Sequence, residues 1–76
     1  MTAMEINREA ARQIMDTGDA TKLVYLGCEY EIDEVVRHDD AMYATVYATD
    51  VDSILCLPDE FRMYPSGRIQ YVGAAF

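Results

Sequence analysis

The sequence predicts an α+β fold: an N-terminal helix packed on a small curved antiparallel sheet of four or five strands, which could form a partly open barrel. Apolar residues near the N-terminus recur at helical spacing, whereas most later segments alternate with a period of two or end at turn residues. Six tyrosines without a tryptophan favour strands over a helical bundle. One amphipathic helix needs an apolar sheet face to cover, and the 76 residues suit a single domain spanning 1–76.

The N-terminal segment carries signals for both ends of a helix. Thr2 followed by Glu5 is typical of a capping box, and Asn7 is a competing cap. The residues around Gly18 end the helix. The side that packs on the sheet is expected to consist of Ile6, Ala10, Ala11, Ile14 and Met15.

The remaining chain predicts short strands joined by turns. The strands are expected at residues 22–26, 28–36, 42–49, 54–57 and 68–72. Both faces of residues 42–49 are partly apolar, so the inward side of this strand is left open. Residues 58–61 are expected to form one helical turn, and Pro65-Ser66-Gly67 a turn before the last strand. The apolar tail, residues 73–76, either docks on the sheet or mediates association.

The negative charge of the chain is concentrated in one segment. Residues 29–60 hold ten acids and one cation, Arg37, which gives −9; the remainder carries +1, so the total is −8. Concentrated charge of one sign repels itself and weakens the compact state, which a basic partner would relieve. The same charge argues against direct binding of nucleic acid and against anionic membrane surfaces.

Targeting signals and cysteine usage suggest the compartment. No apolar run approaches the roughly 20 residues that span a bilayer, and residues 1–5 lack the regions of a signal peptide. We therefore expect a cytoplasmic protein. In a reducing compartment Cys28 and Cys56 are expected to be two half-buried thiols without a disulfide.

Motifs for catalysis or metal binding are weak. The single histidine, His38, is expected to be an exposed turn residue, since no nucleophile signature accompanies it. Residues 50–53 begin like a calcium loop, but Leu55 and Phe61 stand where the loop needs glycine and glutamate. Two distant cysteines and one histidine give no zinc set. We expect neither enzymatic activity nor a cofactor or metal.

The row Glu29, Glu31 and Asp33 is the strongest functional signal. A period of two places these acids on one strand face, about 6.6–6.8 Å apart, roughly half the charge density of one DNA strand. Tyrosines that border the acids would favour a protein interface. The predicted partner-binding residues are Glu29, Glu31, Asp33, Glu34, Asp39, Asp40, Tyr43, Tyr47, Asp50 and Asp52.

The order of elements resembles the small acid-soluble spore proteins of the H type. The corresponding pieces lie within residues 10–61: Ala11 to Ile14 with Thr17, Lys22 to Gly27, Tyr30, Ile32, Ala44-Thr45-Val46, Leu57-Pro58 and Phe61. Residues 63–76 extend past the usual end of that family, and the middle segment is more acidic. The resemblance implies a small non-catalytic bacterial protein, either in the spore core or derived from such a gene, and it carries no catalytic residues.

Three functional hypotheses remain from the sequence. The first is a non-enzymatic binding protein that occupies a basic, nucleic-acid-binding protein surface, most concretely a phage nucleic-acid mimic of the anti-CRISPR kind. The second is a spore-associated structural protein, as the resemblance implies. The third is a homo-oligomer in which residues 72–76 add a strand to a neighbouring sheet edge. On sequence alone, a solvated acidic face without a partner is at least as well supported as the first hypothesis.

Overall fold

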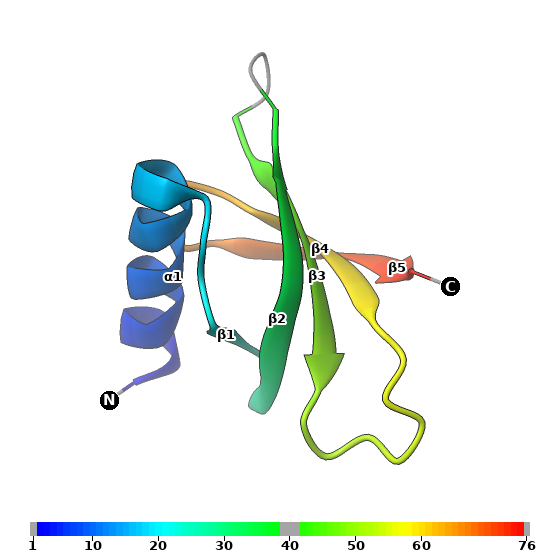
Figure 1. The fold of residues 1–76 in the computed structure, drawn as a ribbon. Coiled ribbons are helices and arrows are strands. Elements are labelled where there is room, and N and C mark those ends of the chain that lie inside the picture. Colours follow the sequence, from blue (N-terminus) through cyan, green and yellow to red (C-terminus); the bar gives the residue numbers. More distant parts are fainter. Residues whose placement is uncertain (1, 39–41, 76) are drawn as a thin grey trace.

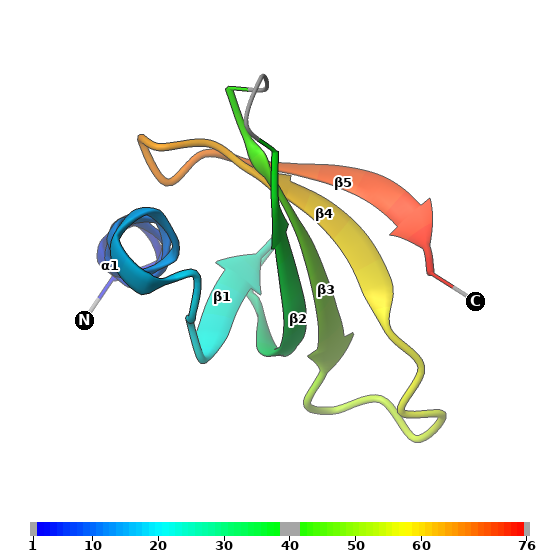
Figure 2. The same cartoon turned by 45° about the horizontal axis from the view of Figure 1, so that its top comes forward.

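The computed structural model describes residues 2–38 and 42–75 and confirms the α+β fold. Its five strands form one antiparallel sheet in the order β1-β2-β3-β4-β5, a meander without crossovers. The sheet curls into a half-barrel, and α1 stands beside it near β1 (Figures 1 and 2). The elements are α1 (Ala3–Thr17), β1 (Lys22–Tyr25), β2 (Cys28–Arg37), β3 (Ala44–Asp50), β4 (Asp59–Met63) and β5 (Ile69–Ala74).

The ends of α1 follow the sequence signals. The Thr2 hydroxyl oxygen accepts a hydrogen bond from the backbone N–H of Glu5 at 3.2 Å, and the Glu5 carboxylate accepts one from the Thr2 hydroxyl at 3.1 Å. Gly18 ends the helix at φ 82°, and its N–H donates to the Ile14 carbonyl at 3.0 Å. Thr2 is therefore the cap, and Asn7 lies inside the helix, free for another role.

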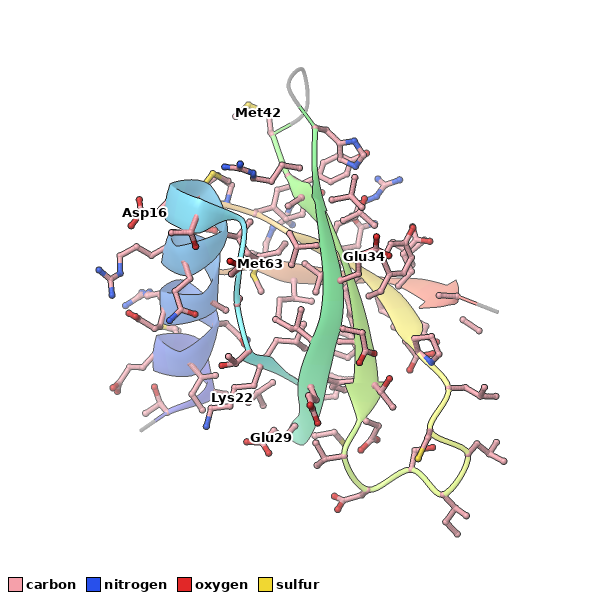
Figure 3. The ribbon with its side chains drawn as sticks, in the orientation of Figure 1. Asp16, Lys22, Glu29, Glu34, Met42 and Met63 are labelled. Carbon is pink, nitrogen blue, oxygen red and sulfur yellow. The ribbon has the colours of Figure 1, made fainter. Side chains whose placement is uncertain are left out.

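The core lies between α1 and the inner face of the sheet. Alternate residues of β3 point inward, which settles the face that the sequence left open. The prediction that Met15 packs on the sheet is wrong, since its side chain is 46% exposed. Met63 of β4 lies toward the helix side of the sheet (Figure 3). The buried residues are Ala10, Ala11, Ile14, Leu23, Ala44, Val46, Ala48, Phe61 and Met63, as well as the polar Thr45.

Aromatic rings draw the two edges of the sheet together. The Phe61 ring meets those of Tyr25, Tyr30 and Tyr71 edge-on, at centroid distances of 5.5, 4.9 and 5.4 Å. Tyr25 on β1 also stacks on Tyr71 on β5 at 5.9 Å. Because β1 and β5 are the edge strands, this contact explains why the sheet curls instead of remaining flat.

A β-bulge in β2 changes which side chains share a face. Ile32 lies opposite Ala48 and Glu34 lies opposite Tyr47, so Asp33 is the extra residue. The shift returns Val35 to the inner face, where it packs against the core. It also places Glu34 on the outer face, whereas the alternation that precedes the bulge would have placed it on the inner face.

Two predicted elements are wrong. Residues 54–57 form no strand, because β3 and β4 already have a hydrogen-bonded partner on each side. Residues 58–61 form no helical turn, since Asp59–Met63 is strand β4. The alternation around Phe61 and Met63 buries both side chains in the core, and that burial overrides the local preference after Pro58 for a turn.

The turn before the last strand is confirmed. Within it, the N–H of Gly67 donates to the Tyr64 carbonyl at 2.8 Å, and the N–H of Tyr64 to the Arg68 carbonyl at 2.9 Å. The chain then pairs with β4 as far as Ala74, and the N–H of Ala75 donates to the Pro58 carbonyl at 3.1 Å. Most of the apolar tail therefore docks on its own sheet. Among the described residues, no helix is long and apolar enough to cross a bilayer.

Candidate acidic binding surface

Four carboxylates gather on the outer face of the sheet, away from α1. In register across β2, β3 and β4, Glu34 lies opposite Tyr47, and Tyr47 lies opposite Glu60. Cross-strand partners share a face, and the neighbouring pairs that contain Ala48 and Phe61 point inward. We call the outward set of Glu31, Asp33, Glu34 and Glu60, with Tyr47 among them, the acidic face.

The bulge brings Asp33 into the acidic face. Thr49 lies opposite Glu31 on the outer side, and its hydroxyl donates a hydrogen bond to the Asp33 carboxylate at 2.6 Å. Asp33 is thus held between Glu31 and Glu34. A fourth outward acid, Glu60, lies two strands away from Glu34, with Tyr47 between them.

Two cations lie in register with the acidic face, but among the described residues they form no ion pair with its four acids. Lys22 is the cross-strand partner of Glu31, and Arg62 lies at the next outward position of β4 after Glu60. Arg37, the one cation of the acidic segment, turns toward α1, where its guanidinium donates to the Met15 carbonyl at 3.5 Å and lies over Gly18. Among the described residues, the ion pairs are those of Arg12 with Glu9 at 2.5 Å and of Lys22 with Glu29 at 3.7 Å. Glu29 is therefore partly neutralised at the start of β2 (Figure 3).

Asp50 lies on the inner side of the sheet, opposite Tyr30. Partial burial raises the pKa of Tyr30, and the charges of Asp50 and Asp59 raise it further. The pKa of Tyr71 is also raised, first by partial burial and then by Asp59, whose carboxylate accepts a hydrogen bond from the Tyr71 hydroxyl at 3.2 Å. Asp50 is thus separated from the acidic face by the sheet itself.

The remaining predicted acids are not part of the acidic face. Asp52 is exposed in the loop after β3, where its N–H donates to the Asp50 carboxylate at 2.9 Å. Asp39 and Asp40 lie outside the described residues. Of the ten predicted partner-binding residues, the fold therefore brings four together on the acidic face: Glu31, Asp33, Glu34 and Tyr47.

Tyr43 belongs to a cationic cluster that adjoins the acidic face, because Arg62 is the next outward residue of β4 after Glu60. The Arg62 guanidinium lies 4.7 Å from the centre of its ring, and the rings of Tyr64 and His38 lie 5.9 and 5.6 Å away. Arg68 covers Tyr64 in the same way at 4.3 Å. Tyr43 thus borders cations, whereas Tyr47 borders the acids.

Glu60 is the residue of the acidic face that the sequence reasoning missed. The expected helical turn at residues 58–61 hid the alternation of Asp59–Met63, in which Phe61 and Met63 point inward. Reading that segment as a strand would have placed Glu60 outward. The period-two pattern was therefore the available signal.

Metal-ligand clusters and cysteines were the remaining candidate features of the described residues. Its His, Cys, Asp and Glu side chains form no cluster of three or more that could hold a metal ion. Cys28 and Cys56 are both unpaired, as expected, but they are exposed instead of half-buried, because each lies at or near a turn.

The comparisons with known proteins give no relative. No family model matches the chain, and no curated protein or solved structure matches it. The fold and its surface therefore define only a class: a small α+β half-barrel protein with an anionic outer sheet face.

Proposed function

We propose that this chain is a non-enzymatic, cytoplasmic binding protein that occupies a basic, nucleic-acid-binding surface of another protein. In its most concrete form it is a phage-encoded nucleic-acid mimic that blocks a host defence effector, in the manner of anti-CRISPR proteins. The observation that carries this proposal is the acidic face: Glu31, Asp33, Glu34 and Glu60 converge on one side of the sheet, while Arg37 points to the other.

The spacing of these acids suits a surface that normally contacts phosphates. Neighbouring strands lie about 4.8 Å apart, so Glu34 and Glu60, which flank Tyr47, have backbones about 10 Å apart. Duplex DNA carries one phosphate per strand about every 3.4 Å of helix axis, so this face presents its charges more sparsely than one DNA strand, and long cationic side chains are needed to reach them. Arginine and lysine side chains placed for phosphates can therefore meet carboxylates on this face.

Tyr47 adds an aromatic contact to the charges of the acidic face. It lies at the centre of the acidic face and is half-buried, so its ring is held in place before binding. Tyrosine is enriched at the centres of interfaces because it buries a large area at a small entropic cost. The face thus combines steering charges with a central aromatic contact.

The mechanism is competition. Long-range attraction speeds the encounter with a basic groove, and the bound protein then excludes DNA or RNA from that groove. No bond is made or broken, so the chain needs neither a nucleophile nor a metal.

Neutralising the acidic face tests the proposal. The partner is isolated with the wild-type chain, purified, and titrated with a variant carrying Glu31→Gln, Asp33→Asn, Glu34→Gln and Glu60→Gln. We expect a loss of affinity of roughly 100-fold or more and a shallower dependence of log Kd on log salt concentration. The control variant has the same change in charge within α1 and the segment that follows it: Glu5→Gln, Glu9→Gln, Asp16→Asn and Asp19→Asn.

Two outcomes would contradict the proposal. One is a neutralised variant that binds as tightly as the control; the other is a partner whose nucleic-acid binding is unaffected by this chain. The genomic setting separates the alternatives at low cost, since phage genes beside the coding sequence favour the inhibitor and sporulation genes favour the spore protein.

One structural feature supports the self-association hypothesis as a second candidate. β5 is an edge strand, and Tyr71 and Val72 on it are 42% and 44% exposed. A second copy could add its own edge strand there. Sedimentation of the wild-type chain and of a Val72→Lys variant would show a concentration-dependent dimer only in the former.

A further inference from the structure

The loop between β3 and β4 exposes large apolar side chains. Ile54 is 97% exposed and Leu55 is 74% exposed, and Val51 and Leu57 on either side are 48% and 39% exposed. The loop extends beyond the end of the sheet in both ribbon views (Figures 1 and 2). Contiguous exposed apolar residues of this size mark interaction sites more often than ordinary surface. We call residues 51–57 the apolar loop.

The apolar loop is organised by its own hydrogen bonds. The N–H of Ser53 donates to the Asp50 carbonyl at 3.0 Å, and the N–H of Asp52 to the Asp50 carboxylate at 2.9 Å. Cys56 adopts φ 52°, and its thiol donates to the Ser53 carbonyl at 3.6 Å. A hydrogen-bonded turn at residues 50–53 therefore leads directly into Ile54 and Leu55, which restricts the loop and lowers the entropic cost of burying them in a partner.

The apolar loop is continuous with the acidic strand. The N–H of Val51 donates to the carbonyl of Glu29, the first acid of β2, at 3.2 Å. β3 leads into the loop directly from Thr49, which holds Asp33 in the acidic face. A partner that covers the acidic face is therefore adjacent to Ile54 and Leu55.

The acids around the apolar loop indicate which kind of partner it would bind. Asp50 and Asp52 precede Ile54, and Asp59 follows Leu57 by two residues. These acids repel an anionic lipid surface, which disfavours insertion into such a membrane. They suit instead an apolar pocket with lysine or arginine at its rim, because the exposed Asp52 can then pair as the apolar side chains are buried.

We infer that Ile54 and Leu55 form an apolar anchor that enters such a cation-rimmed pocket on the protein whose basic surface receives the acidic face. This inference rests on the proposed function. It adds that recognition has two parts: the carboxylates steer and select, and the anchor slows dissociation.

Photo-cross-linking tests the contact directly. The photoreactive residue p-benzoylphenylalanine replaces Ile54, Glu34 or, as a control, the exposed helix residue Arg12, each in the full chain expressed in its host. We expect adducts from positions 54 and 34 with the same protein, and no such adduct from position 12. The cross-linked peptide from position 54 is expected to hold apolar residues with lysine or arginine nearby. An adduct of position 54 with lipid, with a second copy or with a different protein, or no adduct, would overturn the inference.

Affinity measurements separate the two parts of recognition. Replacing both apolar residues, Ile54→Ser with Leu55→Ser, is expected to weaken binding by about 100-fold or more without changing the salt dependence. The matched control is Leu26→Ser, which removes an equally exposed leucine (85%) from the β1–β2 turn and should leave binding unchanged. Unaltered circular dichroism of all variants shows that each remains folded.

The possible results distinguish the inference from the proposed function. If the serine variants bind normally while the neutralised acidic face fails to bind, the anchor is refuted and the proposed function stands. If the serine variants lose binding while the neutralised face binds normally, the proposed function is refuted, and the inference with it. Binding of the wild-type chain to vesicles of phosphatidylcholine with phosphatidylglycerol would also overturn the inference.

Discussion

The side-chain amide of Asn7 forms two hydrogen bonds with the backbone of Val24. Its Nδ2 donates to the Val24 carbonyl and its Oδ1 accepts from the Val24 N–H, both at 2.8 Å. β1 is an edge strand, paired only with β2, so these backbone groups would otherwise face outward. Asn7 therefore takes the place of a further strand at this position, and it fixes the helix against the edge of the sheet.

Removing the Asn7 amide is expected to destabilise the protein. Asn7→Ala leaves a partly buried donor and acceptor of Val24 without their partners, which costs about 1–3 kcal/mol of unfolding free energy. Asn7→Asp keeps the acceptor for the N–H but cannot donate to the carbonyl, so an intermediate loss is expected. Urea denaturation of the three proteins measures the difference, and equal stability of all three would show that the contact contributes nothing.

The turn between β4 and β5 is expected to tolerate no side chain at Gly67. Gly67 has φ 93°, and a Cβ there would lie 2.9 Å from the backbone nitrogen of Arg8 in α1. Gly67→Ala therefore combines left-handed strain of about 1–2 kcal/mol with a clash between the turn and the helix. The expected loss of unfolding free energy is about 2–4 kcal/mol, read from the shift of the denaturation midpoint.

Gly27 provides the matched control for Gly67. It has a similar φ of 77° in the β1–β2 turn, but a Cβ there meets nothing within 4 Å. Gly27→Ala should lose only the conformational part, about 1 kcal/mol. If both alanine variants were equally stable, close packing of the β4–β5 turn on α1 would be contradicted.

Local patterns predict the helix and most of the strands. The capping box at Thr2, the end at Gly18 and the turn at Gly67 each depend on a few neighbouring residues, so they are visible in the sequence. The alternation of β2 likewise predicts that Glu31 and Asp33 share a face. These features depend on local geometry, and the rest of the fold does not alter them.

Long-range contacts determine the features of the fold that local sequence patterns do not predict. The bulge at Asp33 appears only when β2 pairs with β3, and it moves Glu34 to the outer face. β4 forms at residues 59–63 because Phe61 completes an aromatic cluster from three other strands. Ile54 and Leu55 resemble strand residues, but β3 and β4, which they connect, already have a partner on each side. Half of the acidic face and the exposure of the loop therefore depend on tertiary structure.

Repulsion within the acidic face is expected to reduce stability at low salt. Replacing Glu34 and Glu60 by glutamine removes two like charges that flank Tyr47, and the unfolding free energy should rise by about 0.5 kcal/mol near 0.01 M salt, where screening extends over about 30 Å. The gain should disappear at high salt. Glu9→Gln is the control, since it removes the exposed partner of Arg12 and should not stabilise the protein. Thermal melts at both salt concentrations give the comparison, and a gain that persists at high salt would contradict the electrostatic cause.

Alkaline pH is expected to destabilise the fold through two tyrosines on the inner side of the sheet. Partial burial and the nearby carboxylates raise the pKa of Tyr30 and Tyr71 above the ordinary value of 10.0, so the folded protein holds both phenol protons more tightly than the unfolded chain. Their contribution to stability is complete below pH 10.0 and is lost as pH rises through the raised pKa values of the folded state. The free energy of unfolding should therefore fall with pH in that range.

Two variants test this assignment of the alkaline transition. Tyr30→Phe with Tyr71→Phe should flatten the decline, since neither position then titrates. Asp59→Asn should lower the pKa of both tyrosines toward 10.0, because it removes a carboxylate that raises each of them. Tyrosinate absorbance follows the titration, and urea denaturation across the same pH range follows stability. An unchanged decline in the double phenylalanine variant would assign the alkaline unfolding to other groups.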